Sequence, residues 1–347
     1  MSGDRPGSIE AGPILEVRDL AVSFRTERGL VRAVDGVSLT LGEREILSIV
    51  GESGSGKTLT VLAVMGLIRD PNAIVEGSIR FRGRELVGLP DGEMRRVRGG
   101  AIAMIFQNPM TALTPVYAIG RQIAEQVRAH RPLSRRAAAR RAVELIEAVG
   151  IPNPAGAAQR FPHELSGGMR QRAVIAMALS CDPALLLADE PTTALDVTVQ
   201  AQILDLVRKL RADFGSSVIL ITHNMGVVAE IADRVAVMYA GRIVERAETA
   251  ALFREPRHPY TLGLLGSIPP LEGARPRRLP AIPGTPPSPF AIPEGCPFGP
   301  RCRWREAACA VRPELVAEGG HETACILTKE ARAAARAQSL AVTAGAA

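Results

Sequence analysis

The stretch that decides the fold runs from residue 51 to residue 58 and reads Gly51-Glu52-Ser53-Gly54-Ser55-Gly56-Lys57-Thr58. An apolar run, residues 46–50, precedes it, and a helical pattern, residues 59–67, follows it. This order of strand, glycine-rich loop and helix is the setting that a phosphate-binding P-loop requires. The glycines let successive backbone N–H groups point at phosphate oxygens, and the start of the helix adds partial positive charge there. We therefore predict a nucleoside triphosphate site in which Lys57 reaches the β- and γ-phosphates and the Thr58 hydroxyl ligates Mg²⁺.

The composition is that of a globular chain with an ample core. Its 347 residues are 46% hydrophobic and 22% charged, which allows one large domain or two smaller ones. No apolar run reaches the roughly eighteen residues that a membrane-spanning helix needs, and residues 1–13 lack the apolar centre of a signal peptide. We therefore expect a cytoplasmic protein. The net charge of +6 comes from arginines spread along the chain, which indicates compositional bias; attraction to anionic lipid headgroups is the alternative, and no nucleic-acid partner is expected.

The segments around the P-loop predict an α/β fold. Short apolar segments within residues 14–41 and at residues 77–81 suit an antiparallel sheet beside the P-loop core. Strand and helix patterns alternate elsewhere, which indicates a mostly parallel sheet; the strands are residues 102–106, 184–188, 217–222 and 235–239, and the helices are residues 169–180, 197–214 and 225–232. Residues 109–180 form an inserted helical subdomain, in which Ser134 is an expected N-cap and Gly150 an expected helix stop.

The composition changes after Pro259. Eleven prolines between Pro269 and Pro300 indicate an extended connector rather than a core. Four cysteines follow within thirty residues, and His321 among them is expected at the surface, with a role as a spare metal ligand as the alternative. The Ala- and Arg-rich residues 328–347 are expected to be a frayed or disordered tail.

Two carboxylates end the apolar strand of residues 185–188. Asp189 and Glu190 then lie at the carboxyl end of a parallel strand, where such sheets place their ligands. Asp189 is expected to hold Mg²⁺, directly or through water. Glu190 is expected to act as the general base that activates water for attack on the γ-phosphate.

The segment Leu165-Ser166-Gly167-Gly168-Met169-Arg170-Gln171-Arg172 opens a helix just before that strand. It resembles the signature motif of ABC ATPases, with Met169 where many members have glutamine. The other landmarks of that family follow in order: Gln107 resembles the Q-loop glutamine, Thr193-Ala194-Leu195-Asp196 the D-loop, His223 the switch histidine, and Phe24 the aromatic residue that stacks on adenine.

The resemblance implies a mechanism. Two nucleotide-binding domains pair head to tail, so that the P-loop of one and the signature residues 165–169 of the other enclose each ATP. Catalysis is carried by Glu190, His223 and Gln107, and Mg²⁺ is held by Thr58, Gln107 and Asp189. Because the chain holds one P-loop and one signature motif, it must pair with itself or with a related ATPase. Closure on ATP would then drive a membrane domain that contacts the helical subdomain.

Two further segments resemble the ATPases of peptide and nickel importers. These are residues 190–203 and the run Arg257-His258-Pro259-Tyr260-Thr261, which is followed by Leu264-Leu265 and Ile268-Pro269. The resemblance covers residues 14–327 and divides the chain into a nucleotide-binding domain, residues 14–256, and a C-terminal extension, residues 257–327. It implies a peripheral protein on the cytoplasmic face of the inner membrane. Its implied partners are a paralogous ATPase, with a homodimer as the alternative, two permeases and an external solute-binding protein.

The transported solute stays open at this point. Peptides are expected; the alternatives are nickel or another non-peptide solute. A soluble ABC ATPase acting on nucleic acid is a further alternative, which the sequence disfavours because it shows neither a second cassette nor a long coiled-coil insertion.

The four late cysteines are Cys296, Cys302, Cys309 and Cys325, separated by five, six and fifteen residues. In a reducing compartment such a group suits a shared metal better than disulfides. The gaps lack the C-x₂-C repeats of zinc ribbons and bacterial ferredoxins. The set resembles the cysteines that hold a [4Fe–4S] cluster in some peptide-importer ATPases; zinc and free thiols are the alternatives. Cys181 is expected to be a buried small residue.

Overall fold

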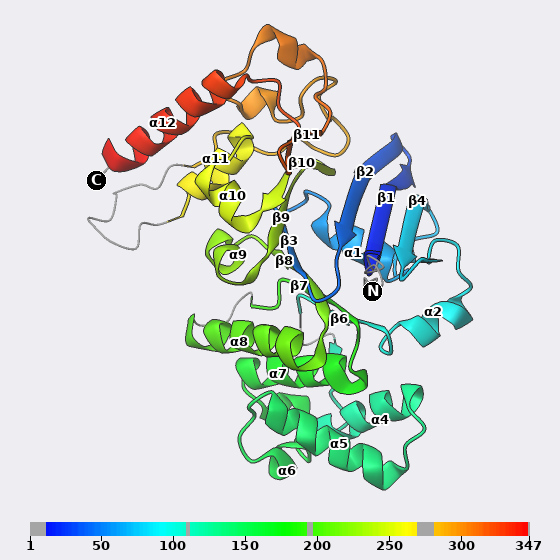
Figure 1. Ribbon diagram of the computed structural model, residues 1–347. Coiled ribbons are helices and arrows are strands. Elements are labelled where there is room, and N and C mark those ends of the chain that lie inside the picture. The colour runs from blue at the N-terminus through cyan, green and yellow to red at the C-terminus, as the bar shows by residue number, and fades with distance from the viewer. Residues whose placement is uncertain (1–11, 109–111, 193–196, 269–280, 346–347) are drawn as a thin grey trace, which may run out of the picture.

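The computed structural model describes residues 12–108, 112–192, 197–268 and 281–345 (Figure 1). An eight-stranded sheet forms the centre, in the order β11-β12-β10-β9-β3-β8-β7-β6. Its parallel strands are β9 (Arg234–Tyr239), β3 (Ile46–Val50), β8 (Ser217–Thr222), β7 (Leu185–Asp189) and β6 (Ile102–Ile105). Strand β10 (Arg242–Glu248) then pairs antiparallel with β9.

The parallel strands are buried on both faces, which is why they occur in the sequence as continuous apolar runs. Successive residues of β7 point to opposite faces: Leu186 and Ala188 join one core, and Leu185 and Leu187 join the other. The first core is closed by helices, among them α8 (Val197–Phe214), and the second by the antiparallel sheet and α1 (Lys57–Val64).

The second sheet has four strands in the order β2-β1-β4-β5. Its strands and the helix that follows them are β1 (Leu15–Thr26), β2 (Gly29–Leu41), β4 (Ala73–Phe81), β5 (Arg84–Glu85) and α2 (Asp91–Val97). Neighbouring strands in this sheet run antiparallel, as the sequence predicts.

The inserted helices gather at one end of the molecule (Figure 1). They are α4 (Ile119–His130), α5 (Arg135–Ala148), α6 (Pro154–Ala157), η1 (Pro162–Glu164), α7 (Gly167–Ala178) and η2 (Leu179–Cys181). Ser134 caps α5, because its side chain accepts a hydrogen bond from the Ala137 N–H at 3.2 Å. Gly150 follows the helix with φ 71°, which favours glycine. The predicted α/β fold with its antiparallel sheet and helical insertion is therefore confirmed.

The C-terminal extension is continuous with the central sheet. The helices α9 (Met225–Ile231) and α10 (Thr249–Arg254) precede it. Its described elements are α11 (Pro259–Gly266), η3 (Gly299–Arg301), η4 (Ala307–Ala310), β11 (Val316–Glu318) and β12 (His321–Thr323), and helix α12 (Lys329–Gly345) follows it. Strand β12 pairs antiparallel with β10, where Thr323 lies opposite Glu245. The extension thus adds two strands, β12 and β11, to the edge of the central sheet.

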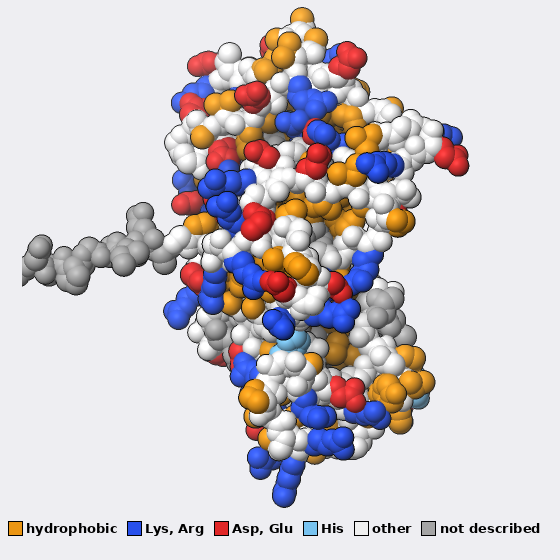
Figure 2. Space-filling view, turned by 90° about the vertical axis from the view of Figure 1, so that its right-hand side faces the viewer, with side chains coloured by type: hydrophobic (Ala, Val, Ile, Leu, Met, Phe, Trp, Pro, Cys, Tyr) orange, Lys and Arg blue, Asp and Glu red, His pale blue; other side chains and the backbone are white. Residues whose placement is uncertain are grey.

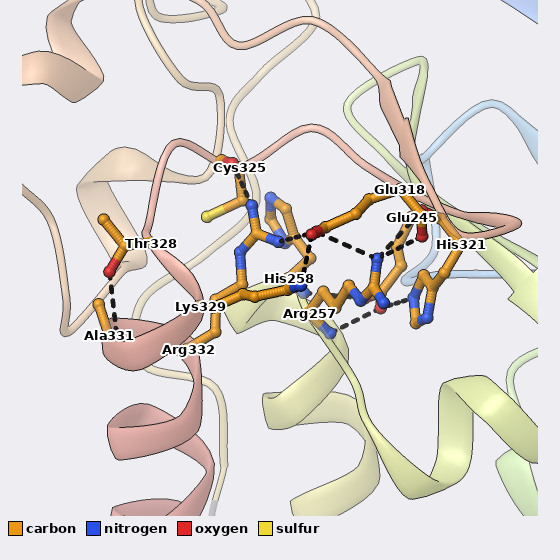
Figure 3. Close-up of polar contacts among 10 residues, drawn as sticks. All are labelled: Glu245, Arg257, His258, Glu318, His321, Cys325, Thr328, Lys329, Ala331 and Arg332. Atoms are coloured by element: carbon orange, nitrogen blue, oxygen red, sulfur yellow. Dashed lines mark hydrogen bonds and ion pairs between the residues drawn. The ribbon is translucent and has the colours of Figure 1, made fainter.

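A buried carboxylate fastens this junction (Figure 3). Glu245 has no exposed surface and accepts hydrogen bonds from the backbone N–H groups of Arg257 and His258, at 2.7 and 2.9 Å. The Nε2 atom of His321 lies 2.6 Å from the same carboxylate. The prediction of a surface position for His321 is wrong, because a buried carboxylate needs donors on every side and this histidine supplies one.

The prediction of a frayed tail is also wrong. Residues 329–345 form α12, which begins where the Thr328 hydroxyl accepts a hydrogen bond from the Ala331 N–H at 3.2 Å. Alanine is the best helix former, and Ala335 is buried. The Trp304 indole donates to Gln338 Oε1 at 3.1 Å and ties the helix to the extension.

Basic and acidic side chains intermingle over most of the face in Figure 2, without a stripe of one sign. Many arginines pair with carboxylates, as Arg208 does with Asp205 and Glu230. Within the described residues, no helix combines the length and apolar character needed to cross a bilayer.

Candidate nucleotide-binding site

The P-loop leaves the carboxyl end of β3 and enters α1 at Lys57. Gly51 has φ 157°, and a Cβ atom there would lie 2.2 Å from the Met238 carbonyl oxygen. Gly56 has φ 101°, and a Cβ atom there would lie 2.9 Å from the Ala33 carbonyl oxygen. Both positions therefore require glycine, which explains the sequence of the loop.

Lys57 is buried inside this loop. Its ammonium group donates hydrogen bonds to the carbonyl oxygens of Gly51, at 2.7 Å, and Glu52, at 2.9 Å. Burial lowers the pKa of Lys57, while the carboxylates of Glu190, Asp189 and Glu52 act in the opposite direction. The loop thus holds a cation close to backbone N–H groups at a helix start, which is an arrangement that attracts phosphate.

A hydroxyl and a carboxylate meet beside the lysine. Thr58 Oγ1 donates a hydrogen bond to Asp189 Oδ1 at 3.2 Å. Asp189 is 3% exposed, and burial raises its pKa, as does the charge of Glu190; the Thr58 hydrogen bond and Lys57 lower it. A hydroxyl oxygen and a carboxylate oxygen are ligands that Mg²⁺ prefers, so these residues fit the ion that the sequence implies.

Three side chains that follow the ends of neighbouring strands lie together at Glu190. Gln107, which follows β6, donates from Nε2 to Glu190 Oε2 at 3.0 Å. His223, which follows β8, places Nδ1 at 3.3 Å from Glu190 Oε1. Glu190 itself follows β7 with φ 46°, an uncommon backbone conformation for a residue other than glycine that occurs often at functional sites. The structure therefore brings the three predicted catalytic side chains together.

The signature residues 165–169 lie on other elements. Ser166 caps α7 by accepting a hydrogen bond from the Met169 N–H at 3.3 Å. In Figure 1, α7 packs among the inserted helices, whereas α1 lies beside the antiparallel sheet. Phe24 is half-buried against the core on β1, and Asp196 with the rest of the predicted D-loop lies outside the described residues.

Contacts from the C-terminal extension to the P-loop were not predicted. Tyr260 and Arg301 both contact Glu52, the second residue of the loop. No local sequence signal marks these contacts, since Arg301 lies 249 residues from Glu52.

The four late cysteines line one small cavity, together with His258. Burial raises the pKa of Cys302 and of Cys325 to about 11, so both thiols hold their protons at neutral pH. The donor chemistry suits a thiolate-bound metal. As the side chains stand, no group of three or more candidate ligands in the described residues is placed to hold a metal ion, so the thiols would have to move to share one.

Fold and site together define a P-loop nucleotide-binding cassette. A family model described as "ABC transporter" matches residues 34–193, and one described as "Oligopeptide/dipeptide transporter, C-terminal region" matches residues 244–309. The chain belongs to the ABC transporter family, in the branch of ATP-binding subunits that carries this C-terminal region. Members of this family bind ATP with Mg²⁺.

Relatives support this assignment. A putative peptide import ATP-binding protein of Brucella melitensis is 51% identical over 92% of this chain and 98% of its own length. The oligopeptide transport ATP-binding protein OppD of Mycobacterium tuberculosis is 54% identical over 91% of this chain. The chain spans only 52% of that mycobacterial protein. The dimeric post-hydrolysis structure of the ATP-binding cassette MJ0796, bound to ADP and Pi, matches 68% of this chain and 98% of its own with a TM-score of 0.62 and 26% identity.

Proposed function

We propose that this chain is the ATP-hydrolysing subunit of an ABC importer that carries peptides across the cytoplasmic membrane. The observation that carries the hydrolytic part is the grouping of Gln107 and His223 around Glu190, beside the pair formed by Thr58 and Asp189. The peptide part is supported by the C-terminal region and by the printed names of the relatives. Nickel or another solute is the alternative.

Each residue has a proposed task. Glu190 accepts a proton from the attacking water, and Gln107 and His223 hold its carboxylate toward that water. Lys57 and the N–H groups of the P-loop bind the phosphates, and Thr58, Asp189 and Gln107 would hold Mg²⁺, which neutralises charge on the phosphates. Phe24 stacks on the adenine.

The proposed assembly contains more than this chain. The signature residues 165–169 would close on the ATP of a second cassette, either a paralogous ATPase or a second copy of this chain. The inserted helices would contact two permeases on the cytoplasmic face of the membrane, and a solute-binding protein would deliver the cargo outside.

Transport in proteoliposomes tests this function. The chain is reconstituted with candidate permeases and a candidate second ATPase of the peptide-importer type, and uptake of a labelled tripeptide and of ⁶³Ni²⁺ is measured with a candidate solute-binding protein and ATP. ATP-dependent uptake of the peptide supports the proposal. Uptake of nickel alone would support the alternative, and uptake that persists without this chain would contradict both.

We further propose that Cys296, Cys302, Cys309 and Cys325 hold a [4Fe–4S] cluster. The proposal is supported by their position around one cavity and requires the thiols to rearrange and to lose their protons. Iron content, zinc content and the visible spectrum of anaerobically purified protein test it. Cys302→Ser should abolish the colour, whereas Cys181→Ser, a buried cysteine elsewhere, should keep it. Colourless protein without iron would contradict the proposal.

A further inference from the structure

Glu52 of the P-loop is held from two sides by the C-terminal extension. Its backbone N–H donates a hydrogen bond to the Tyr260 hydroxyl at 2.7 Å. Its carboxylate accepts two hydrogen bonds from Arg301, from Nη1 to Oε2 at 2.6 Å and from Nη2 to Oε1 at 3.0 Å. Its carbonyl oxygen accepts from Lys57. Every polar group of this residue is therefore engaged, and the first turn of the loop is fixed in place.

Every N–H group of the Arg301 guanidinium donates a hydrogen bond at this junction. Its side chain is 5% exposed, and besides Glu52 it donates from Nη1 to the Tyr239 hydroxyl at 3.3 Å, from Nε to the Pro283 carbonyl at 2.8 Å, and from Nη2 to the Gly284 carbonyl at 3.3 Å. These contacts account for all five N–H donors of an arginine. A lysine cannot reproduce these two parallel hydrogen bonds from a planar group to one carboxylate.

The same arginine belongs to the loop that carries the first two late cysteines, residues 296–302, which we name the cysteine loop. Arg301 is followed directly by Cys302. The Cys296 N–H donates to the Cys309 carbonyl at 2.9 Å, and the Phe298 ring packs edge-on against Tyr239 at 5.3 Å between ring centres. A movement of the cysteine loop would therefore move the guanidinium group that holds Glu52.

We propose that Arg301 is a positioning residue of the ATP site, which acts through Glu52 and links the P-loop to the cysteine loop. Without the guanidinium, the carboxylate of Glu52 would lie unpaired on the loop that receives the triphosphate, and its charge would oppose that of the phosphates. With it, the charge is neutralised and the backbone N–H groups of the loop keep their direction. By reciprocity, ATP on the loop restrains the cysteine loop.

A double-mutant cycle tests the action through Glu52. Arg301→Met should raise the Kd for ATP about tenfold or more, because it leaves the partly buried carboxylate of Glu52 unpaired on the loop that binds the triphosphate. Glu52→Gln removes that charge, so the double variant Glu52→Gln/Arg301→Met should bind ATP more tightly than Arg301→Met alone. Arg303→Met, an exposed arginine of the same segment, is the matched control and should bind as the wild type does. Lys57→Ala should abolish tight binding, which checks the site itself.

The link to the cysteine loop is tested by hydrogen exchange on the full chain as purified. ATP with Mg²⁺ should slow exchange at residues 296–302 in the wild type and in Arg303→Met, and should have less effect in Arg301→Met and Arg301→Lys. An arginine that only stabilises the fold would give no response of this loop to ATP. Equal ATP affinity in Arg301→Met and Arg303→Met, or a double variant no better than Arg301→Met, would overturn the proposal. If Arg301→Met does not fold, hydrogen exchange at residues 296–302 is measured in Glu52→Gln with and without ATP instead. ATP that slows this exchange as much as it does in the wild type would overturn the proposal.

Discussion

The nucleotide site and the C-terminal extension hold their polar side chains by different means. The polar side chains of the site lie at or just after the ends of buried parallel strands, so the sheet itself aligns them; they are Gln107, Asp189, Glu190 and His223. The extension consists mainly of loops and short helices, and it is fastened by buried charges such as Glu245 and Arg301. Changes in the strand-end residues should therefore alter chemistry, whereas changes in the buried charges should alter stability and position.

The largest effect is expected at Glu190. Glu190→Gln keeps the hydrogen-bonding shape of the side chain and removes the base, so ATP turnover should fall about 10²- to 10⁴-fold while ATP binding and dimerisation are retained. Steady-state turnover and calorimetric binding measure the two properties. An unchanged turnover rate would contradict the role of Glu190 as the base.

The next largest effect is expected at the junction of extension and core. Glu245→Gln removes a buried carboxylate that accepts from two backbone N–H groups and lies against His321, so the free energy of unfolding should fall by about 3 kcal/mol. Urea unfolding and limited proteolysis of the extension measure it. Glu248→Gln, at the exposed end of the same strand, is the control, and equal unfolding midpoints for the two variants would argue against the role of Glu245 at this junction.

A third prediction concerns acid sensitivity. Burial is the main cause of a pKa of about 4 for His258; the charge of Glu245 opposes this shift, and the charge of Arg332 adds to it. The unfolded chain binds this proton below about pH 6.5, whereas the folded chain does not, so stability should be lost as the pH falls from about 6.5 to 4, by about 3 kcal/mol in all. His258→Asn keeps an acceptor for the Tyr260 N–H and cannot be protonated, so its urea midpoint should depend less on pH. The exposed His163→Asn should behave as the wild type does, and identical pH profiles for all three proteins would contradict the assignment.

The smallest effect is expected at the start of α12. Thr328→Ala removes the hydroxyl that accepts from the Ala331 N–H and should lower stability by about 1 kcal/mol, whereas Thr328→Ser should be nearly neutral. Thermal unfolding followed by circular dichroism compares the two. A larger loss in the serine variant than in the alanine variant would show that the cap is not the cause.

The strand-end site could be predicted from the sequence because each of its parts has a local signal. The P-loop is one contiguous motif, and Asp189 and Glu190 end an apolar run. Because the carboxyl ends of parallel strands lie at the same edge of a sheet, the P-loop and these two carboxylates are expected to lie close together. Gln107 and His223 needed the family resemblance, since a lone glutamine or histidine after a strand has many explanations. The structure then places both beside Glu190.

The extension could not be predicted in the same way. Its contacts join residues far apart in the chain, and charged residues such as Glu245 and Arg301 carry no pattern that distinguishes a buried partner from a solvated one. His321 was expected at the surface for the same reason. The helix at residues 329–345 was missed because its Ala- and Arg-rich composition resembles that of a tail, while its cap and its packing against Trp304 depend on the folded extension.

The pairing of β12 with β10 bears on any shortened form of this protein. A chain cut at residue 256 would leave the outer row of N–H and C=O groups on β10 open to solvent and the Glu245 side chain without its donors. Such a row is a template on which strands of other molecules can add. Aggregation of such a shortened protein during expression would then be caused by the absence of strand β12 and not by a defect in the ATPase site.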